Sequence, residues 1–247
     1  MVSLLWADQP FPLVPTCKSL KPKASPDAIF IADGMANVHN SLIRCLNSMY
    51  QQAPYVSLPT DVKDLLLYAK FWLELVHHHH SMEEDELFPA VARIAGKQGI
   101  MDVNIEQHRM FGAGMTEFAK YVKACTEGEP FEERRFRGLI DSFGTELSKH
   151  LGDEIVTLLA LDVYDIKAVR EEYDNFDSKM RSGPKDQLYP LVMGCADRAY
   201  EGGNNFPNAP LFVFYVIHYW LERRHSSVWR FNPSTTWGER RPLHFHA

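Results

Sequence analysis

A run of four histidines, followed after two intervening residues by four acidic residues, constrains this sequence more than any other feature. The run begins at His77, deep inside the chain, in a segment whose apolar spacing predicts a long helix. Side chains four residues apart lie on one face of a helix, so His79 pairs with Glu83. In the neighbouring register, His80 pairs with Glu84. An imidazole and a carboxylate one turn apart form half of a metal site. We prefer the register of His79 and Glu83 and leave the other open.

Apolar residues at spacings of three and four predict amphipathic helices along most of the chain. In the clearest case the pattern holds from Phe136 to Leu161, which is the spacing of a bundle core. Ser25 and Pro26 form a helix-start signal. We therefore expect an all-α fold, an antiparallel up-down-up-down four-helix bundle. Its helices are expected at about residues 25–53, 60–95, 104–128 and 136–161.

Each predicted helix places a histidine in its apolar stripe. In the fourth helix, His150 and Glu154 interrupt an otherwise apolar row. Burying an unpaired carboxylate costs several kcal/mol, and a metal ion would relieve that cost. Imidazole and carboxylate ligands without thiolates suit iron, manganese or zinc. The candidate metal ligands are His39, His79, Glu83, His108, His150 and Glu154.

The segments that carry these residues resemble the hemerythrin-like, or HHE cation-binding, family. Their amino-acid sequences are similar to those of its fungal branch. The resemblance covers residues 28–165. It implies a non-heme di-iron centre in a four-helix bundle, in proteins that carry oxygen, sense gases or redox state, or hold iron. The matching segments are Val38–Asn40, His79–Glu84, Leu87–Pro89, Glu106–His108 and His150–Glu154.

The sequence departs from the family pattern at Gly112, where the hemerythrin type has a second histidine on the third helix. The resemblance then implies that one metal position lacks a ligand, unless His80 or Glu84 substitutes. We therefore expect one divalent ion, zinc in preference to iron.

The resemblance also assigns roles to the remaining ligands. The complete position would use His39 and His79, with Glu83 and Glu154 as shared carboxylates. His108 and His150, partly released from ligand duty, become candidate catalytic residues, because a histidine titrates near neutral pH.

The rest of the chain surrounds the bundle predicted over residues 25–165. Residues 1–24 are rich in proline and predict an extended arm. Residues 166–247 predict an extension packed on the bundle, with a polar loop over 174–186 and an apolar row over 211–221. This extension would cover bundle surface and shape a substrate pocket.

Composition excludes several classes of partner. The net charge is −6, from 26 basic and 32 acidic residues, and no basic cluster occurs, so we expect no nucleic-acid and no membrane partner. No apolar run is long enough to span a bilayer. The four cysteines form no C-x-x-C motif and fit reduced thiols, which favours a cytoplasmic protein. The oligomeric state stays open.

Two functions remain. The first is an enzyme of fungal secondary metabolism whose divalent metal acts as a Lewis acid on a small-molecule substrate without redox chemistry. The resemblance suggests a lyase-type reaction, ring contraction of a cyclopenin-type alkaloid to a viridicatin-type quinolone. The second is a non-heme di-iron protein for O₂ or NO binding, sensing or iron storage. The missing histidine and the C-terminal cover favour the first.

Overall fold

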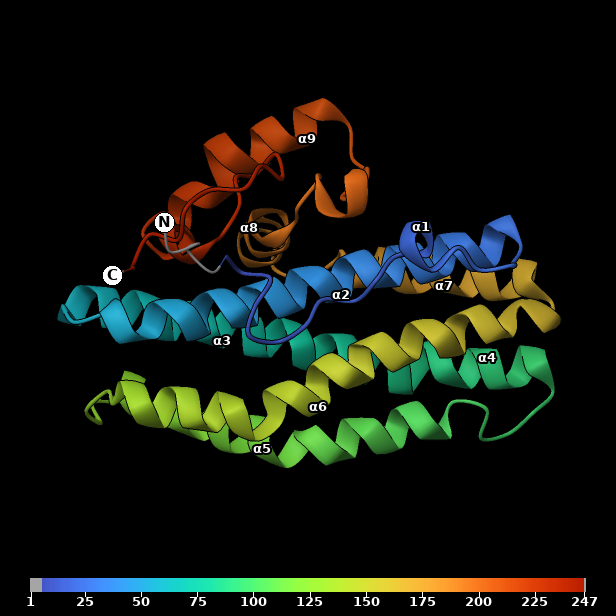
Figure 1. The fold of residues 1–247 in the computed structure, drawn as a ribbon, viewed down its shortest axis with the longest axis horizontal. Helices are drawn as coiled ribbons and strands as arrows, with labels where there is room; N and C mark the ends of the chain where they lie inside the picture. Colours follow the sequence, from blue (N-terminus) through green and yellow to red (C-terminus); the bar gives the residue numbers. More distant parts are fainter. Residues whose placement is uncertain (1–5, 247) are drawn as a thin grey trace.

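The computed structural model describes residues 6–246 and contains, within this range, no β-strand and one isolated bridge between Ser234 and Arg240. Four long helices lie along the long axis of the molecule, and consecutive ones run in opposite directions (Figure 1). The predicted fold class, an all-α bundle, is confirmed. The bundle helices are α2 (Pro26–Gln52), α3 (Pro59–Met82), α5 (Asp102–Thr126) and α6 (Glu133–Ala160).

The second bundle helix does not stop at Met82. It continues through a π-helical segment, Glu83–Leu87, into α4 (Phe88–Ala95), and ends at Gly96 in a left-handed conformation with φ of 61°. The i→i+5 bonding of a π-helix fits an additional residue into the turn. Side chains beyond this π segment are therefore rotated relative to those of α3.

Helix α7 (Ile166–Met180) packs against α2, α3 and α4. The loop expected over residues 174–186 is therefore wrong, since only residues 181–184 separate α7 from α8 (Lys185–Cys195). The approach of α7 to α2 is close, because a Cβ atom at Gly34 would lie 2.3 Å from the hydroxyl of Tyr173. The polar composition of this segment conceals a buried apolar stripe that consists of Val169, Tyr173, Phe176 and Met180.

The N-terminal arm follows α2 and includes a single-turn helix, α1 (Cys17–Leu20). Polar side chains of α2 hold its backbone. Asn47 accepts a hydrogen bond from the Phe11 amide at 2.9 Å and donates one to the Phe11 carbonyl at 2.9 Å. Asn40 does the same for Val14, at 2.7 and 2.8 Å. Residues 1–5 of the predicted arm lie outside the described range.

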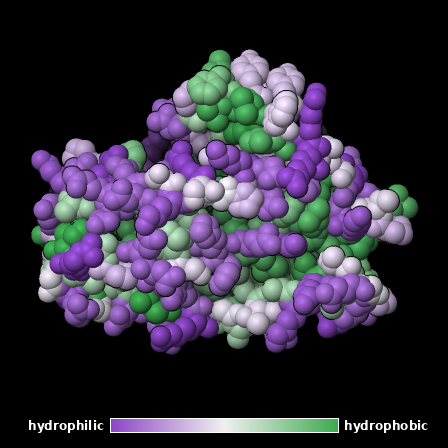
Figure 2. Space-filling view, turned by 180° about the vertical axis from the view of Figure 1, so that it is seen from behind, coloured by the Kyte–Doolittle hydropathy of each residue, from purple (hydrophilic) through white to green (hydrophobic). Residues whose placement is uncertain are grey.

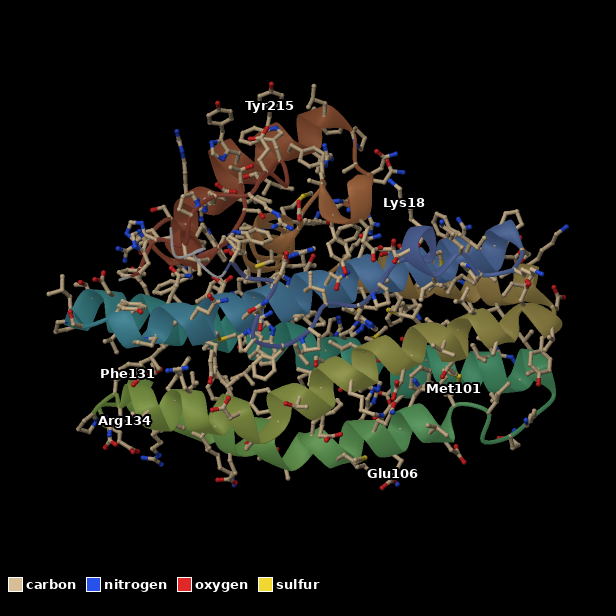
Figure 3. All side chains as sticks on the ribbon, viewed as in Figure 1. Lys18, Met101, Glu106, Phe131, Arg134 and Tyr215 are labelled. Atoms are coloured by element: carbon tan, nitrogen blue, oxygen red, sulfur yellow. The ribbon has the colours of Figure 1, made fainter. Side chains whose placement is uncertain are left out.

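The C-terminal extension lies over α2 and α3 (Figure 1). Its outermost part is α9 (Leu211–Val216), which continues as a π-helical segment, Ile217–Leu221. Apolar side chains gather on this projecting part (Figure 2), and Tyr215 points away from the bundle (Figure 3). Within residues 6–246, no helix combines the length and the apolarity needed to cross a bilayer. The remaining short segments are 3₁₀-helical: Ala53–Tyr55, Leu161–Val163, Tyr200–Gly202, Glu222–His225 and Val228–Phe231.

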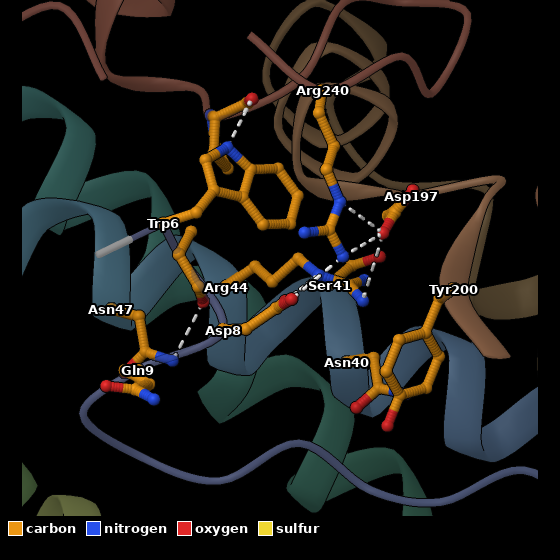
Figure 4. A network of polar contacts seen from close by, with 12 residues as sticks. Trp6, Asp8, Gln9, Asn40, Ser41, Arg44, Asn47, Asp197, Tyr200 and Arg240 are labelled. Atoms are coloured by element: carbon orange, nitrogen blue, oxygen red, sulfur yellow. Dashed lines mark hydrogen bonds and ion pairs between the residues drawn. The ribbon is translucent and has the colours of Figure 1, made fainter. Parts of the chain in front are cut away.

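A buried ionic network fastens the arm and the extension to α2 (Figure 4). Arg44 of α2 is buried and its Nε donates to Asp8 of the arm at 3.0 Å. Its Nη2 lies 3.9 Å from Asp197 of the extension. Arg240 contacts both carboxylates, at 2.8 and 2.7 Å. The two ends of the described chain are thereby fixed to the same helix.

Candidate metal centre

Three buried side chains from α2, α3 and the π segment converge at mid-length in the bundle. His39 Nε2 lies 3.1 Å from His79 Nε2, and His79 Nε2 lies 3.0 Å from Glu83 Oε1. Ligand atoms of these three residues all lie within 4.8 Å of one another. We refer to His39, His79 and Glu83 as the first ligand group.

A second convergence lies directly beside the first. His108 Nε2 of α5 lies 2.9 Å from His150 Nε2 of α6 and 3.6 Å from Glu83 Oε2. Ligand atoms of His80, Glu83, His108 and His150 also lie within 4.8 Å of one another, and we refer to these residues as the second ligand group. The two oxygens of Glu83 therefore face different groups. Glu83 would therefore supply one oxygen to each group.

Glu154 occupies a comparable place on α6. Its Oε2 lies 3.5 Å from His39 Nε2 and 3.9 Å from His150 Nε2, so that it is close to one histidine of each group. The structure thus brings together all six ligand residues that the sequence suggests. Glu83 and Glu154 lie between the two groups.

Hydrogen bonds at Nδ1 orient three of the imidazole rings. His39 donates to the Leu151 carbonyl at 2.8 Å, and His150 donates to Gln107 Oε1 at 3.1 Å. His108 donates to Glu84 Oε1 at 2.6 Å. Because Nδ1 carries the proton in each ring, the Nε2 lone pair faces the centre, as in metal-binding histidines oriented by a second partner.

The structure places His80 and Glu84, the pair of the register that the sequence left open, in different surroundings. His80 is only 7% exposed and joins the second ligand group, whereas the Glu84 side chain is 40% exposed and supports His108 from outside. Glu83 follows His79 by four residues and His80 by three, so one carboxylate lies below both imidazoles. His80 would therefore supply the ligand that is missing at Gly112, and we now expect two ions per chain in place of the one expected from the sequence.

The charge balance of the centre indicates that cations belong there. Glu83 and Glu154 are fully buried, and none of their four oxygens has a hydrogen-bond partner. Burial raises the pKa of both carboxyls, and each is raised further by a neighbouring glutamate. Burial lowers the pKa of His79 to about 4, so this imidazole is neutral at physiological pH. Uncompensated carboxylates among neutral imidazoles are costly without a counter-ion.

The imidazole geometry supports the same conclusion. The Nε2 lone pairs of His108 and His150 face each other at 2.9 Å, and two such acceptors repel. A divalent ion between them would turn this repulsion into coordination. Imidazole and carboxylate donors without cysteine suit zinc, iron or manganese. The residues present therefore fit a metal centre.

Residues 31–161 match the family described as Hemerythrin HHE cation binding domain. The chain belongs to this family. A curated relative of this HHE protein is the "Dimeric xanthone biosynthesis cluster protein R11" of Cryptosporiopsis sp. (strain 8999). The two are 39% identical over 248 residues, which cover 97% of this chain and 93% of the relative. No solved structure matches significantly. The family resemblance seen in the sequence is confirmed.

Two cavities reach the centre of the HHE bundle from different sides. A groove of about 520 Å³ between α3 and α5 extends to His80 and His108. An apolar chamber of about 250 Å³ between α2, α3, α7 and α8 extends to His79. Of the two candidate catalytic histidines, His108 lines the groove, whereas His150 is fully buried and lines neither cavity.

Replacing His80 by alanine is expected to remove the ion of the second ligand group and to retain that of the first. The reason is that only His108, His150 and the shared Glu83 remain in the second group. Metal content per chain, measured by mass spectrometry after dialysis, should fall from two ions to one. The matched control is His78→Ala, which removes an exposed neighbour in the same run. Equal metal content in wild type and His80→Ala would contradict this assignment.

Proposed function

We propose that this protein is a metal-dependent enzyme of fungal secondary metabolism that acts on a small aromatic substrate without redox chemistry. The observation that carries the proposal is the apolar chamber that is lined by His79, a member of the first ligand group. His39, His79, Glu83 and Glu154 would hold the ion. Bound there, a divalent metal supplies Lewis-acid polarisation of a substrate oxygen.

The chamber walls are suited to a flat, apolar molecule. The chamber is lined by the apolar side chains of Met35, Leu75, Phe176 and Val192. They would exclude water from the side of the first ligand group on which His79 lies. One wall comes from α7, where Tyr173 and Phe176 lie on the face that packs against the bundle. Such a site binds ring systems through shape and burial.

A few polar groups give the chamber an orientation. Asp177 and Arg181 line the same cavity and form an ion pair of 2.8 Å, one turn apart on the outer end of α7. Tyr173 lines the same cavity, and burial raises its pKa well above the usual value of a tyrosine, so its hydroxyl stays protonated as a hydrogen-bond donor. Polar substituents of a substrate would be held at this outer end. The reacting end would face His79.

The chamber, together with the relative, supports one chemical class of substrate. That protein's name refers to dimeric xanthone biosynthesis. Xanthones are flat, fused-ring ketones, and a ketone oxygen is a suitable group for Lewis-acid activation. A cyclopenin-type alkaloid is the second substrate that we propose to test, with ring contraction as its reaction. This alkaloid also presents a carbonyl group beside aromatic rings. Zinc, rather than iron, is the proposed metal.

A different function is favoured by one feature of the centre. Two ligand groups share Glu83, which is an arrangement for two adjacent ions. The alternative is therefore a dinuclear iron protein that binds O₂ or NO, or stores iron.

Zinc-loaded protein should convert a xanthone-type ketone or a cyclopenin-type alkaloid under strictly anaerobic conditions, whereas metal-free protein should not. Product formation is followed by liquid chromatography with mass spectrometry. His79→Ala should abolish turnover, because its imidazole is the ligand at the end of the chamber, and His78→Ala should retain it. Turnover of neither substrate with zinc, together with reversible O₂ or NO binding by iron-loaded protein, would favour the alternative.

A further inference from the structure

We propose that the groove between α3 and α5 is a separate entrance through which hydrated divalent cations reach the second ligand group, and that Gly112 keeps it open. This inference rests on the metal centre and is independent of the reaction. The two cavities would then have different roles. Cations would reach the centre through the groove, and the aromatic substrate would reach it through the chamber.

The groove has the lining that a cation requires. It contains three carboxylates, those of Glu74, Glu84 and Asp85, and no lysine or arginine among its described lining residues. Clefts lined by one sign of charge concentrate ions of the opposite sign and accelerate their association. His77 stands in the same lining and offers a further nitrogen at the outer end.

The inner end of the groove carries an unsatisfied ligand. His80 lines the groove, is 7% exposed, and its Nε2 has no hydrogen-bond partner within the described structure. His108, whose Nε2 faces the centre, lines the same end. A buried imidazole nitrogen without a partner is costly unless it binds something. The groove therefore leads to a position prepared for a cation.

Gly112 determines whether this path is open. It lies one turn after His108 on α5, and a Cβ atom built on it would meet no atom within 4 Å. The next positions of α5 along the groove are also small or flexible, namely Met115, Thr116 and Ala119. A longer side chain at residue 112 would extend into the free space. Because Gly112 has no side chain, a passage beside His80 stays open.

Within residues 6–246, neither of these two cavities gives the first ligand group such a path. His39 and His79 do not line the groove, and the chamber that reaches His79 is walled mainly by apolar side chains. A hydrated cation loses its water shell in apolar surroundings at a large free-energy cost. Ions should therefore exchange rapidly at the second ligand group and slowly at the first.

The test is the rate of zinc release from fully loaded protein to the chromogenic chelator 4-(2-pyridylazo)resorcinol. Wild type should release zinc in two phases of equal amplitude. Gly112→Met should slow the fast phase severalfold and leave the slow phase unchanged. Gly138→Met is the matched control, because a Cβ there also meets no atom within 4 Å but lies on the exposed side of α6. Fast release that is unaltered in Gly112→Met would overturn the proposal.

A second pair of variants tests the charge of the groove without touching a ligand. Removing the carboxylates of Glu74 and Asp85 by Glu74→Gln and Asp85→Asn should slow zinc uptake by metal-free protein up to about tenfold at low ionic strength, and should weaken its salt dependence. Glu117→Gln is the control, since this carboxylate is on α5 but outside the groove. If Gly112→Met can be isolated only with one bound ion, its release rates cannot be compared with wild type. The uptake measurement then tests the entrance without that variant. Uptake that is insensitive to both carboxylates would overturn the proposal.

Both measurements use zinc and no substrate. Failure of the proposed reaction would leave two-phase release intact. Failure of the proposed entrance would leave anaerobic turnover intact.

Discussion

Replacing Glu83 by glutamine should empty both ligand groups and leave the bundle folded. Glu83 is the one residue that belongs to both groups, and its two oxygens face opposite sides. Glutamine preserves the shape of the side chain but removes its charge. Because ligand binding stabilises the folded state, the variant should lose about 4 kcal/mol of stabilisation for each of the two ions when free zinc is 1,000-fold above the dissociation constant. Metal content and thermal unfolding with and without zinc measure both effects.

The metal-free proteins should show the opposite order. In wild type without metal, a carboxyl group is buried with no hydrogen-bond partner, whereas the amide of Glu83→Gln carries no charge to bury. Metal-free Glu83→Gln should therefore unfold at a temperature equal to or above that of metal-free wild type. Glu86→Gln, an adjacent and more exposed site that pairs with Lys179, is the control. Retention of one tightly bound ion by Glu83→Gln would show that His39 and His79 suffice without it.

Replacing Arg44 by alanine should strongly destabilise the protein, although Arg44 lies outside the metal centre. The side chain is 2% exposed and lies between Asp8 and Asp197, with its guanidinium 5.0 Å from the centre of the Tyr200 ring. Removing one partner of a buried ionic network leaves uncompensated charge, which costs about 3–5 kcal/mol. The free energy of unfolding, measured with urea, should fall by that amount.

The control for Arg44→Ala is Arg135→Ala. Arg135 is about half exposed and pairs with Glu129 at the surface, so its replacement should cost no more than about 1 kcal/mol. Arg44→Ala should also increase protease cleavage of the arm, because Asp8 loses its buried partner. A loss of stability equal to that of Arg135→Ala would mean that Arg240 alone maintains the network.

The sequence predicted the bundle because the burial pattern of a helix is periodic. The stripes through His39 and His150 follow spacings of three and four, and both residues are fully buried. The periodicity is less decisive in the third helix. Apolar residues lie next to each other there, and the structure buries Phe118 while it exposes Ala119.

The second helix shows why periodicity alone could not assign the centre. Two registers fitted it almost equally, one through His79 and Glu83 and one through His80 to Phe88. The π segment explains this, because the buried row follows the first register as far as Leu87 and includes Phe88 after it. The inward position of His80 depends on how α5 and α6 pack around it. The sequence offered it only as a possible substitute.

The position of α2 in the molecule has a consequence for how the protein opens. This helix is covered by the bundle, by α7, by the arm and by the extension, so most of its residues are buried. Helix α5 lies at the opposite edge, with Glu106 on its outer side, and buries few residues (Figure 3). Amides of α2 should therefore exchange with deuterium only through global unfolding, whereas those of α5 exchange through smaller openings. His39 would then stay in place during fluctuations that carry His108 away from its neighbours.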